Sequence, residues 1–183
     1  MTSLCCDVIN RLEGKTLVTA ESCTGGGIGA ALTAIPGSSA VYKGGIISYT
    51  NWVKHNLLGV DENLLETLGA VSAPVAQAMA VGARNALKAD AAVSVTGLAG
   101  PGGDEYGNPV GRVYIGYADE KIATAVDCAI TAYELSRFGN VFQPGEGLVM
   151  ESVEDTIESV GRMGREGMHA TDLEILQIML REE

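Results

Sequence analysis

The chain has 183 residues, of which 46% are hydrophobic, and this is enough for one domain with a complete core. Its formal net charge is -11, so it lacks the basic surface that supplies most nucleic-acid affinity, and we expect no nucleic-acid partner. The segment 146–183 holds ten acidic side chains against three arginines, so about -7 of the charge falls there and about -4 elsewhere.

The cysteines and histidines are not spaced as metal ligands. The four cysteines are Cys5, Cys6, Cys23 and Cys128, with no C-x-x-C pair, and the two histidines lie far from each other. We therefore expect no metal site, and we expect reduced thiols in a cytoplasmic protein. The first residues lack a signal-peptide pattern, and no run of about 18 apolar residues occurs, so we expect neither secretion nor a membrane span.

Short β-rich runs alternate with longer helical patterns through the first half of the chain. The expected elements are a helix over 3–13, a strand over 17–20, a helix over 24–35 stopped by Pro36-Gly37, and a strand over 45–50. A helix then opens near Asp61, another begins at Ser72-Ala73-Pro74, and a buried strand covers 91–96. This alternation predicts an α/β sheet with helices on its faces.

The second half begins with a glycine-rich loop and continues with a hairpin. Residues 97–109 are too rich in glycine and proline for regular structure, and a loop of this length usually serves a site. Strands over 110–118 and 121–130, joined by Asp119-Glu120, predict an antiparallel hairpin and hence a mixed sheet. Helices are expected over 151–160 and 171–180. We interpret 1–183 as one domain, with a core over 1–130 and an acidic helical segment over 131–183.

A serine lies where the first strand turns into a helix. Ser22 follows the apolar run Leu17-Val18-Thr19 and precedes a glycine cluster. A side chain on such a turn is exposed at the sheet edge, and the next helix directs unpaired N–H groups toward it. Ser22 is therefore a candidate nucleophile, and Cys23 beside it is an alternative that the sequence leaves open.

Further polar residues follow the other predicted strands. Tyr49 and Thr50 end the second strand and Thr96 ends the third, and ligands of open α/β sheets bind at this edge. Each residue alone is more typical of a helix cap or a turn than of a site, but their coincidence at one edge of the sheet favours a site. Lys54, a few residues beyond the second strand, is the candidate base for Ser22, because a desolvated lysine can act as a neutral amine.

The glycines also allow a different interpretation. Gly25-x-Gly27-x-x-Ala30 fits the dinucleotide-binding fingerprint between a strand and a helix. That fingerprint requires an acid about 20 residues later to hold the ribose, whereas the next acid after Glu21 is Asp61. A nicotinamide-dependent hydride-transfer enzyme is therefore disfavoured.

Several motifs together resemble one family, the CinA C-terminal domain, or nicotinamide-nucleotide amidohydrolases. The matching pieces, in the family's order, are Ala20-Glu21-Ser22-Cys23-Thr24-Gly25-Gly26, Pro36-Gly37-Ser38-Ser39, Tyr49-Thr50-Asn51 with Lys54, Gly69-Ala70-Val71-Ser72, Thr96-Gly97-Leu98-Ala99-Gly100-Pro101 and Pro109-Val110-Gly111. The resemblance covers about residues 5–118.

The resemblance implies a three-layer α/β/α fold with a mixed, mostly parallel sheet, often in a homodimer. It implies deamidation of nicotinamide mononucleotide to nicotinate mononucleotide and ammonia, without metal or other cofactor. Ser22 matches the nucleophile, Lys54 the base, and Tyr49 and Thr96 residues around the reacting amide. The residues that match substrate-binding positions are Cys23, Thr24, Gly25, Gly26, Gly97, Ala99 and Gly100, and the N–H groups of the first four are expected to hold an oxyanion or phosphate.

The chain departs from the family after Ile130. The family continues into a Gly-Asp-Arg-Glu-like motif whose arginine belongs to the substrate site, and here Gly164-Arg165-Glu166 resembles a displaced remnant. We expect Arg165, in preference to Arg137, to complete the pocket. This departure leaves two alternatives open: a non-catalytic nucleotide-binding or assembly protein on the same fold, and an amidase with another substrate.

Overall fold

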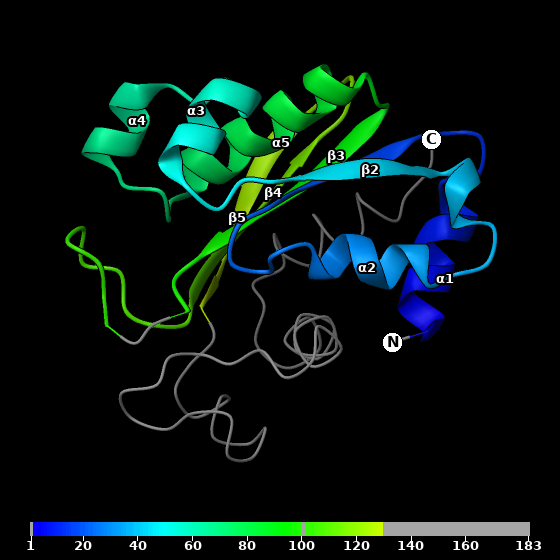
Figure 1. Ribbon diagram of the computed structural model, residues 1–183, viewed down its shortest axis with the longest axis horizontal. Coiled ribbons are helices and arrows are strands. Elements are labelled where there is room, and N and C mark those ends of the chain that lie inside the picture. The colour runs from blue at the N-terminus through cyan, green and yellow to red at the C-terminus, as the bar shows by residue number, and fades with distance from the viewer. Residues whose placement is uncertain (1, 100–101, 130–183) are drawn as a thin grey trace, which may run out of the picture.

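The computed structural model describes residues 2–99 and 102–129, in which helices and strands alternate along the chain (Figure 1). The elements are α1 (Thr2–Arg11), β1 (Leu17–Glu21), α2 (Gly27–Thr33), the 3-10 turn η1 (Ser38–Ala40), β2 (Tyr42–Ile47), α3 (Asn51–Leu58), α4 (Glu62–Thr67), α5 (Ala73–Leu87), β3 (Ala91–Gly97), β4 (Arg112–Ala118) and β5 (Ala123–Ala129). No helix within these residues is long and apolar enough to cross a membrane. The helices expected over 151–160 and 171–180 lie outside the described residues.

The five strands form one mixed sheet in the order β2-β1-β3-β4-β5. The strand β1 pairs in parallel with both β2 and β3, whereas β4 is antiparallel to β3 and to β5. Four of the five strands therefore run in one direction, and β4 alone runs against them. The expected mixed sheet is confirmed, and so is the hairpin that ends it, while two of the four strand pairings are parallel and two are antiparallel.

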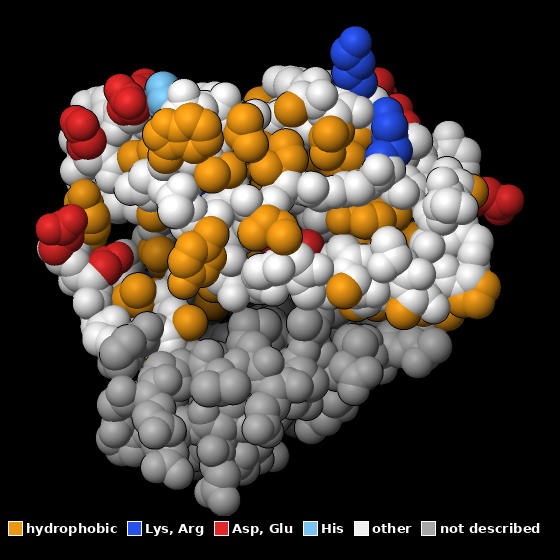
Figure 2. All heavy atoms as spheres, viewed as in Figure 1, with side chains coloured by type: hydrophobic (Ala, Val, Ile, Leu, Met, Phe, Trp, Pro, Cys, Tyr) orange, Lys and Arg blue, Asp and Glu red, His pale blue; other side chains and the backbone are white. Residues whose placement is uncertain are grey.

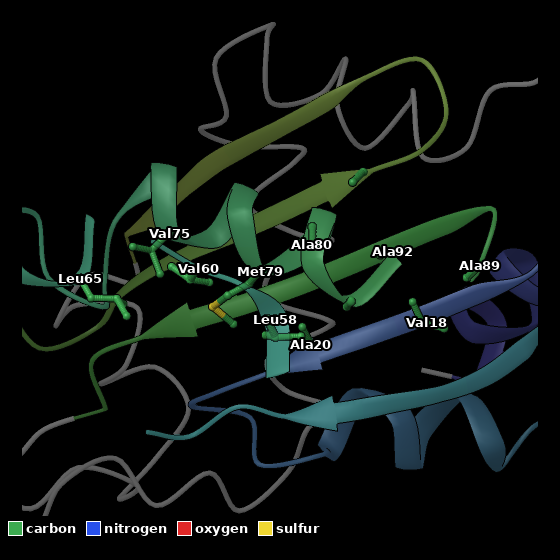
Figure 3. Close-up of a cluster of buried hydrophobic side chains, with 12 residues drawn as sticks. Val18, Ala20, Leu58, Val60, Leu65, Val75, Met79, Ala80, Ala89 and Ala92 are labelled. Carbon is green, nitrogen blue, oxygen red and sulfur yellow. The ribbon is translucent and has the colours of Figure 1, made fainter. Parts of the chain in front are cut away.

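Helices cover both faces of the sheet and make three layers (Figure 1). Neighbouring residues of a strand point to opposite faces. Val18 and Ala92 thus pack with Val75 and Met79 of α5 (Figure 3). Ala118 of β4 belongs to the same cluster. Their neighbours in each strand pack with α1 and α2 in the second cluster, which includes Leu17, Ala91, Tyr117, Ile9 and Leu32. Each completely buried Val or Met side chain stabilises the fold by about 1.5–3 kcal/mol.

The main differences from the expected boundaries are in α2, in β2 and in the connection between β4 and β5. The helix α2 begins at Gly27 instead of Thr24, because Gly25 and Gly26 adopt left-handed backbone angles, which a right-handed helix cannot include. The strand β2 begins at Tyr42 and ends at Ile47, so Tyr49 and Thr50 follow the strand, and Thr50 caps α3. The hairpin connection has four residues rather than two, because Asp119 accepts the N–H groups of Lys121 and Ile122.

A glycine on α5 permits its close contact with α3, the helix that carries Lys54. A Cβ at Gly82 would overlap the backbone carbonyl of Leu58, at the end of α3. Alanine in a helix interior is normally about 1 kcal/mol more favourable than glycine. Overlap with backbone atoms cannot be relieved by rotating a side chain, so at this position the steric effect should dominate.

We predict that Gly82→Ala lowers the free energy of unfolding by about 1–3 kcal/mol, measured by urea denaturation. Gly102→Ala is the control, because no other atom of the described residues lies within 4 Å of a Cβ built there, and it should change stability by less than about 0.5 kcal/mol. A Gly82→Ala variant as stable as the original chain would show that the two helices are not in the described contact.

Candidate active site

The turn after β1 holds Ser22 in a fixed position beside β3. The Ser22 N–H donates to the Val95 carbonyl at 2.9 Å, and the Ser22 carbonyl accepts the Gly25 N–H at 3.1 Å. The left-handed angles of Gly25 and Gly26 then direct the chain into α2. Ser22 is only 7% exposed, so its hydroxyl is held by the protein rather than by bulk water.

Lys54 reaches this hydroxyl from α3. Thr50 caps the helix by accepting the Val53 N–H, and Lys54 lies one turn later on the buried face. Its Nζ lies 3.0 Å from Ser22 Oγ, 2.7 Å from the Ser48 carbonyl and 3.3 Å from the Tyr49 carbonyl. Lys54 is 1% exposed and is among the largest completely buried side chains.

Burial lowers the pKa of Lys54 to about 8, because the charged ammonium loses its hydration, and the nearby Cys23 opposes this only in part. A neutral amine has two N–H bonds and one lone pair. The Ser48 and Tyr49 carbonyls accept hydrogen bonds only, so they match the two N–H bonds and direct the lone pair at the Ser22 hydroxyl. The arrangement can remove a proton from Ser22.

A buried carboxylate, which the sequence analysis passed over as a site residue, supports the turn from the opposite side. Glu21 is 1% exposed and accepts five hydrogen bonds. The donors are the hydroxyls of Thr19 and Thr24 and the N–H groups of Gly26, Ile28 and Gly29. The signal in the sequence was an acid at the end of an otherwise uncharged, buried strand, where a charge needs several donors.

The hydrogen bonds of Glu21 limit which anions the glycine cluster can bind. Because Glu21 already accepts the N–H groups at the start of α2, these are not available to the pyrophosphate of a dinucleotide. The Gly26 N–H is bound by Glu21 and the Gly25 N–H by the Ser22 carbonyl, so neither is available for an oxyanion. Of the four N–H groups expected to hold an oxyanion or phosphate, this leaves those of Cys23 and Thr24.

Cys23 is a poor nucleophile in this position. Burial raises the pKa of its thiol to about 11, even though the N–H groups of Cys23 and Thr24 and the amine of Lys54 lower it. Gly97 packs against it, since a Cβ at Gly97 would lie 3.0 Å from the Cys23 sulfur. The Cys23 thiol therefore fills space between the turn after β1 and the end of β3.

The remaining predicted site residues are distributed unevenly around Ser22. Thr96 is buried at the end of β3, where its hydroxyl donates to the Ala70 carbonyl at 2.8 Å. Tyr49 contacts Lys54 through its carbonyl, whereas its side chain is 72% exposed. Ala99 is half-buried beyond β3. Gly100 and Arg165 lie outside the described residues, and their roles stay predictions.

Exposed apolar side chains lie on β2 and α3 and on the loop between them. Ile47, Tyr49 and Trp52 are 57%, 72% and 67% exposed, and Figure 2 shows hydrophobic side chains gathered where Figure 1 has β2 and α3. The Ile47 side chain extends over the turn that follows Ser22, because its Cδ1 would lie 3.2 Å from a Cβ built at Gly26. The approach to Ser22 is thus partly apolar.

One arginine of the described residues lies at the same sheet edge. Arg112 begins β4, two residues before Tyr114, which pairs with Thr96, so Arg112 and Thr96 belong to the same face. Its Nη1 is 2.5 Å from Asp127, and its buried Nε has no hydrogen-bond partner among the described residues. No sequence motif singled out Arg112 as a site residue.

No group of three or more potential metal ligands occurs within 2–99 and 102–129. What the same residues bring together is a serine hydroxyl and a lysine amine, Ser22 Oγ and Lys54 Nζ.

Comparison with known proteins gives a consistent identification of the fold. The family described as "CinA C-terminal domain" matches residues 3–136. A CinA-like protein of Parasynechococcus marenigrum is 51% identical over 139 residues, and one of Cyanothece sp. is 53% identical over 119 residues. These matches cover 76% and 65% of this chain, which spans only 31% and 28% of the length of the two relatives.

Solved structures with a similar fold carry the same family description or a related one. The competence/damage inducible protein CihA from Agrobacterium tumefaciens has a TM-score of 0.72 at 34% identity, covering 98% of this chain and 95% of that one. A competence-damaged protein (CinA) superfamily protein from Klebsiella pneumoniae has a TM-score of 0.69 at 32% identity, covering 75% of this chain and 89% of that one.

A second family, described as "Serine dehydratase alpha chain", matches residues 111–177, less than half of the chain. Arg165, predicted to be a remnant of the CinA motif, lies inside this stretch and beyond the residues that the CinA domain matches. The first match covers most of the chain and both Ser22 and Lys54. The chain belongs to the CinA C-terminal domain family.

Proposed function

We propose that the chain is an amidohydrolase that converts nicotinamide mononucleotide to nicotinate mononucleotide and ammonia. The observation that carries this proposal is the contact of a buried lysine amine with the Ser22 hydroxyl, at 3.0 Å. The family resemblance supplies the substrate, and the chemistry of the pair supplies the reaction type.

The reaction begins when Lys54 accepts the Ser22 proton and Ser22 Oγ attacks the carboxamide carbon. The carbonyl oxygen becomes an oxyanion, which the N–H groups of Cys23 and Thr24 stabilise. Lys54 returns the proton to the amide nitrogen, the carbon–nitrogen bond breaks, and ammonia leaves an ester on Ser22.

Water completes the cycle. Lys54 accepts a proton from the water molecule as its oxygen attacks the ester carbon, and the bond from that carbon to Ser22 Oγ breaks. The proton returns to Ser22 Oγ, and nicotinate mononucleotide is released. Lys54 begins and ends the cycle as a neutral amine, a form that burial makes more accessible by lowering the pKa to about 8.

We infer that Arg112 provides positive charge for the phosphate of the substrate. It lies on the face of the sheet that carries Thr96, and its buried Nε is free of partners within the described residues. A guanidinium offers donors in a planar fork that suits phosphate oxygens.

We predict that Ser22→Ala and Lys54→Met each lower the rate of ammonia release from nicotinamide mononucleotide by at least about a thousandfold. Ser94→Ala and Lys43→Met are matched controls, because Ser94 bonds to Ala76 on α5 and Lys43 to carbonyls at the end of α5. Saturable binding without turnover in the original chain would favour a nucleotide-binding protein, and release only from other amides would favour another amidase.

We predict that kcat/KM rises with pH and levels off above a midpoint of about 8. Lys54 must be neutral to accept the Ser22 proton, and protonation below its pKa of about 8 removes that capacity. A pH series of initial rates with subsaturating substrate measures the midpoint. A rate that falls as pH rises through 8 would contradict the role of Lys54 as base.

We predict that Arg112→Gln raises KM for nicotinamide mononucleotide about tenfold or more, because the lost charge-assisted hydrogen bonds are worth about 1.5–3 kcal/mol. Nicotinamide riboside, which lacks the phosphate, is the comparison substrate, and its KM should not change. Equal effects on both substrates would rule out a phosphate contact.

A further inference from the structure

Glu21 is a buried carboxylate that the proposed reaction does not use. Its Oε1 accepts the Thr19 hydroxyl at 3.1 Å and the Gly29 N–H at 2.8 Å. Its Oε2 accepts the Thr24 hydroxyl at 2.8 Å, the Gly26 N–H at 3.1 Å and the Ile28 N–H at 3.0 Å. The side chain thus fastens β1 to the whole turn that follows Ser22.

The chemistry of these contacts requires a carboxylate. Three of the five donors are backbone N–H groups, which cannot reverse their role and accept. A glutamine of the same shape would present an NH₂ group to some of them, leaving donors opposed to donors. An aspartate is one methylene shorter than the span that Glu21 bridges.

The backbone of Glu21 extends the same support to the base. Its carbonyl accepts the Ser48 N–H at 2.7 Å, and the Ser48 carbonyl in turn accepts Lys54 Nζ at 2.7 Å. Glu21 is therefore bonded on one side to the loop of the hydroxyl and on the other to a residue that orients the amine.

Strand geometry keeps the charge of Glu21 away from Lys54. Glu21 ends β1 and faces α2, whereas Ser22, the next residue, points to the opposite side of the sheet. There Ser22 meets Lys54 of α3, a helix that packs with α5 on that face (Figure 1). Within the described residues, Lys54 Nζ is hydrogen-bonded to a hydroxyl and to two carbonyls. The carboxylate can order the turn without forming an ion pair that would hold the lysine protonated.

We propose that Glu21 is a positioning residue, whose carboxylate fixes the Ser22 turn against Lys54 so that the hydroxyl and the amine stay within hydrogen-bond distance. This inference rests on the proposed function for its effect on turnover. Its effect on the surroundings of Lys54 is independent of any substrate.

The test compares Glu21→Gln with Ser94→Ala, which removes a buried hydrogen bond from β3 to the Ala76 carbonyl of α5. In the complete chain labelled with ¹³C at lysine Cε, an NMR titration follows Lys54, assigned by its loss in Lys54→Met. Glu21→Gln should loosen the turn, admit water and move the Lys54 midpoint upward from about 8, whereas Ser94→Ala should not move it. For turnover, kcat should fall about 10- to 100-fold, with KM changed by less than about threefold.

The outcomes separate the two proposals. A Lys54 midpoint in Glu21→Gln equal to that in Ser94→Ala would overturn the positioning role, whatever the turnover. Absence of ammonia release by the original chain would overturn the amidohydrolase, while the titration would still decide the role of Glu21. If Glu21→Gln does not fold, Thr24→Val removes one donor to the same carboxylate, and its Lys54 midpoint is read by the same criterion.

Discussion

The contact between the buried Lys54 amine and the Ser22 hydroxyl is the interaction on which the rest of the site depends. Burying a charged ammonium is costly, and this cost lowers the pKa of Lys54 to about 8, so that the neutral amine is the major form above that pH. The two carbonyls around Nζ satisfy the amine without adding negative charge. The cost of burying its charge lowers the pKa of Lys54, and the lowered pKa allows the amine to accept a proton from Ser22.

The sheet provides the separation that this chemistry needs. Glu21 and Ser22 are neighbours in sequence, yet the alternation of β1 directs one side chain to α2 and the other to α3. A carboxylate and a lysine on the same face would have formed an ion pair and raised the pKa of the lysine. The close packing of α3 on α5, which Gly82 allows, brings Lys54 to the correct face.

Much of this arrangement could be predicted from the sequence. Alternating strands and helices gave the layers, and family motifs brought Ser22 and Lys54 together, although burial of a lysine depends on how α3 packs and has no local signal. Glu21 was passed over because its partners are mainly backbone N–H groups five to eight residues away, which no side-chain pattern reveals. The α2 boundary was misplaced for a related reason, since two left-handed glycines delay the helix.

The central claim is that Ser22 forms a covalent ester with the substrate, and rapid acid quenching of the chain during turnover of nicotinamide mononucleotide tests it most directly. Peptide mass spectrometry should find the acyl group of nicotinate mononucleotide on Ser22, and none of it in Lys54→Met. The same group on Cys23 instead of Ser22 would contradict the account.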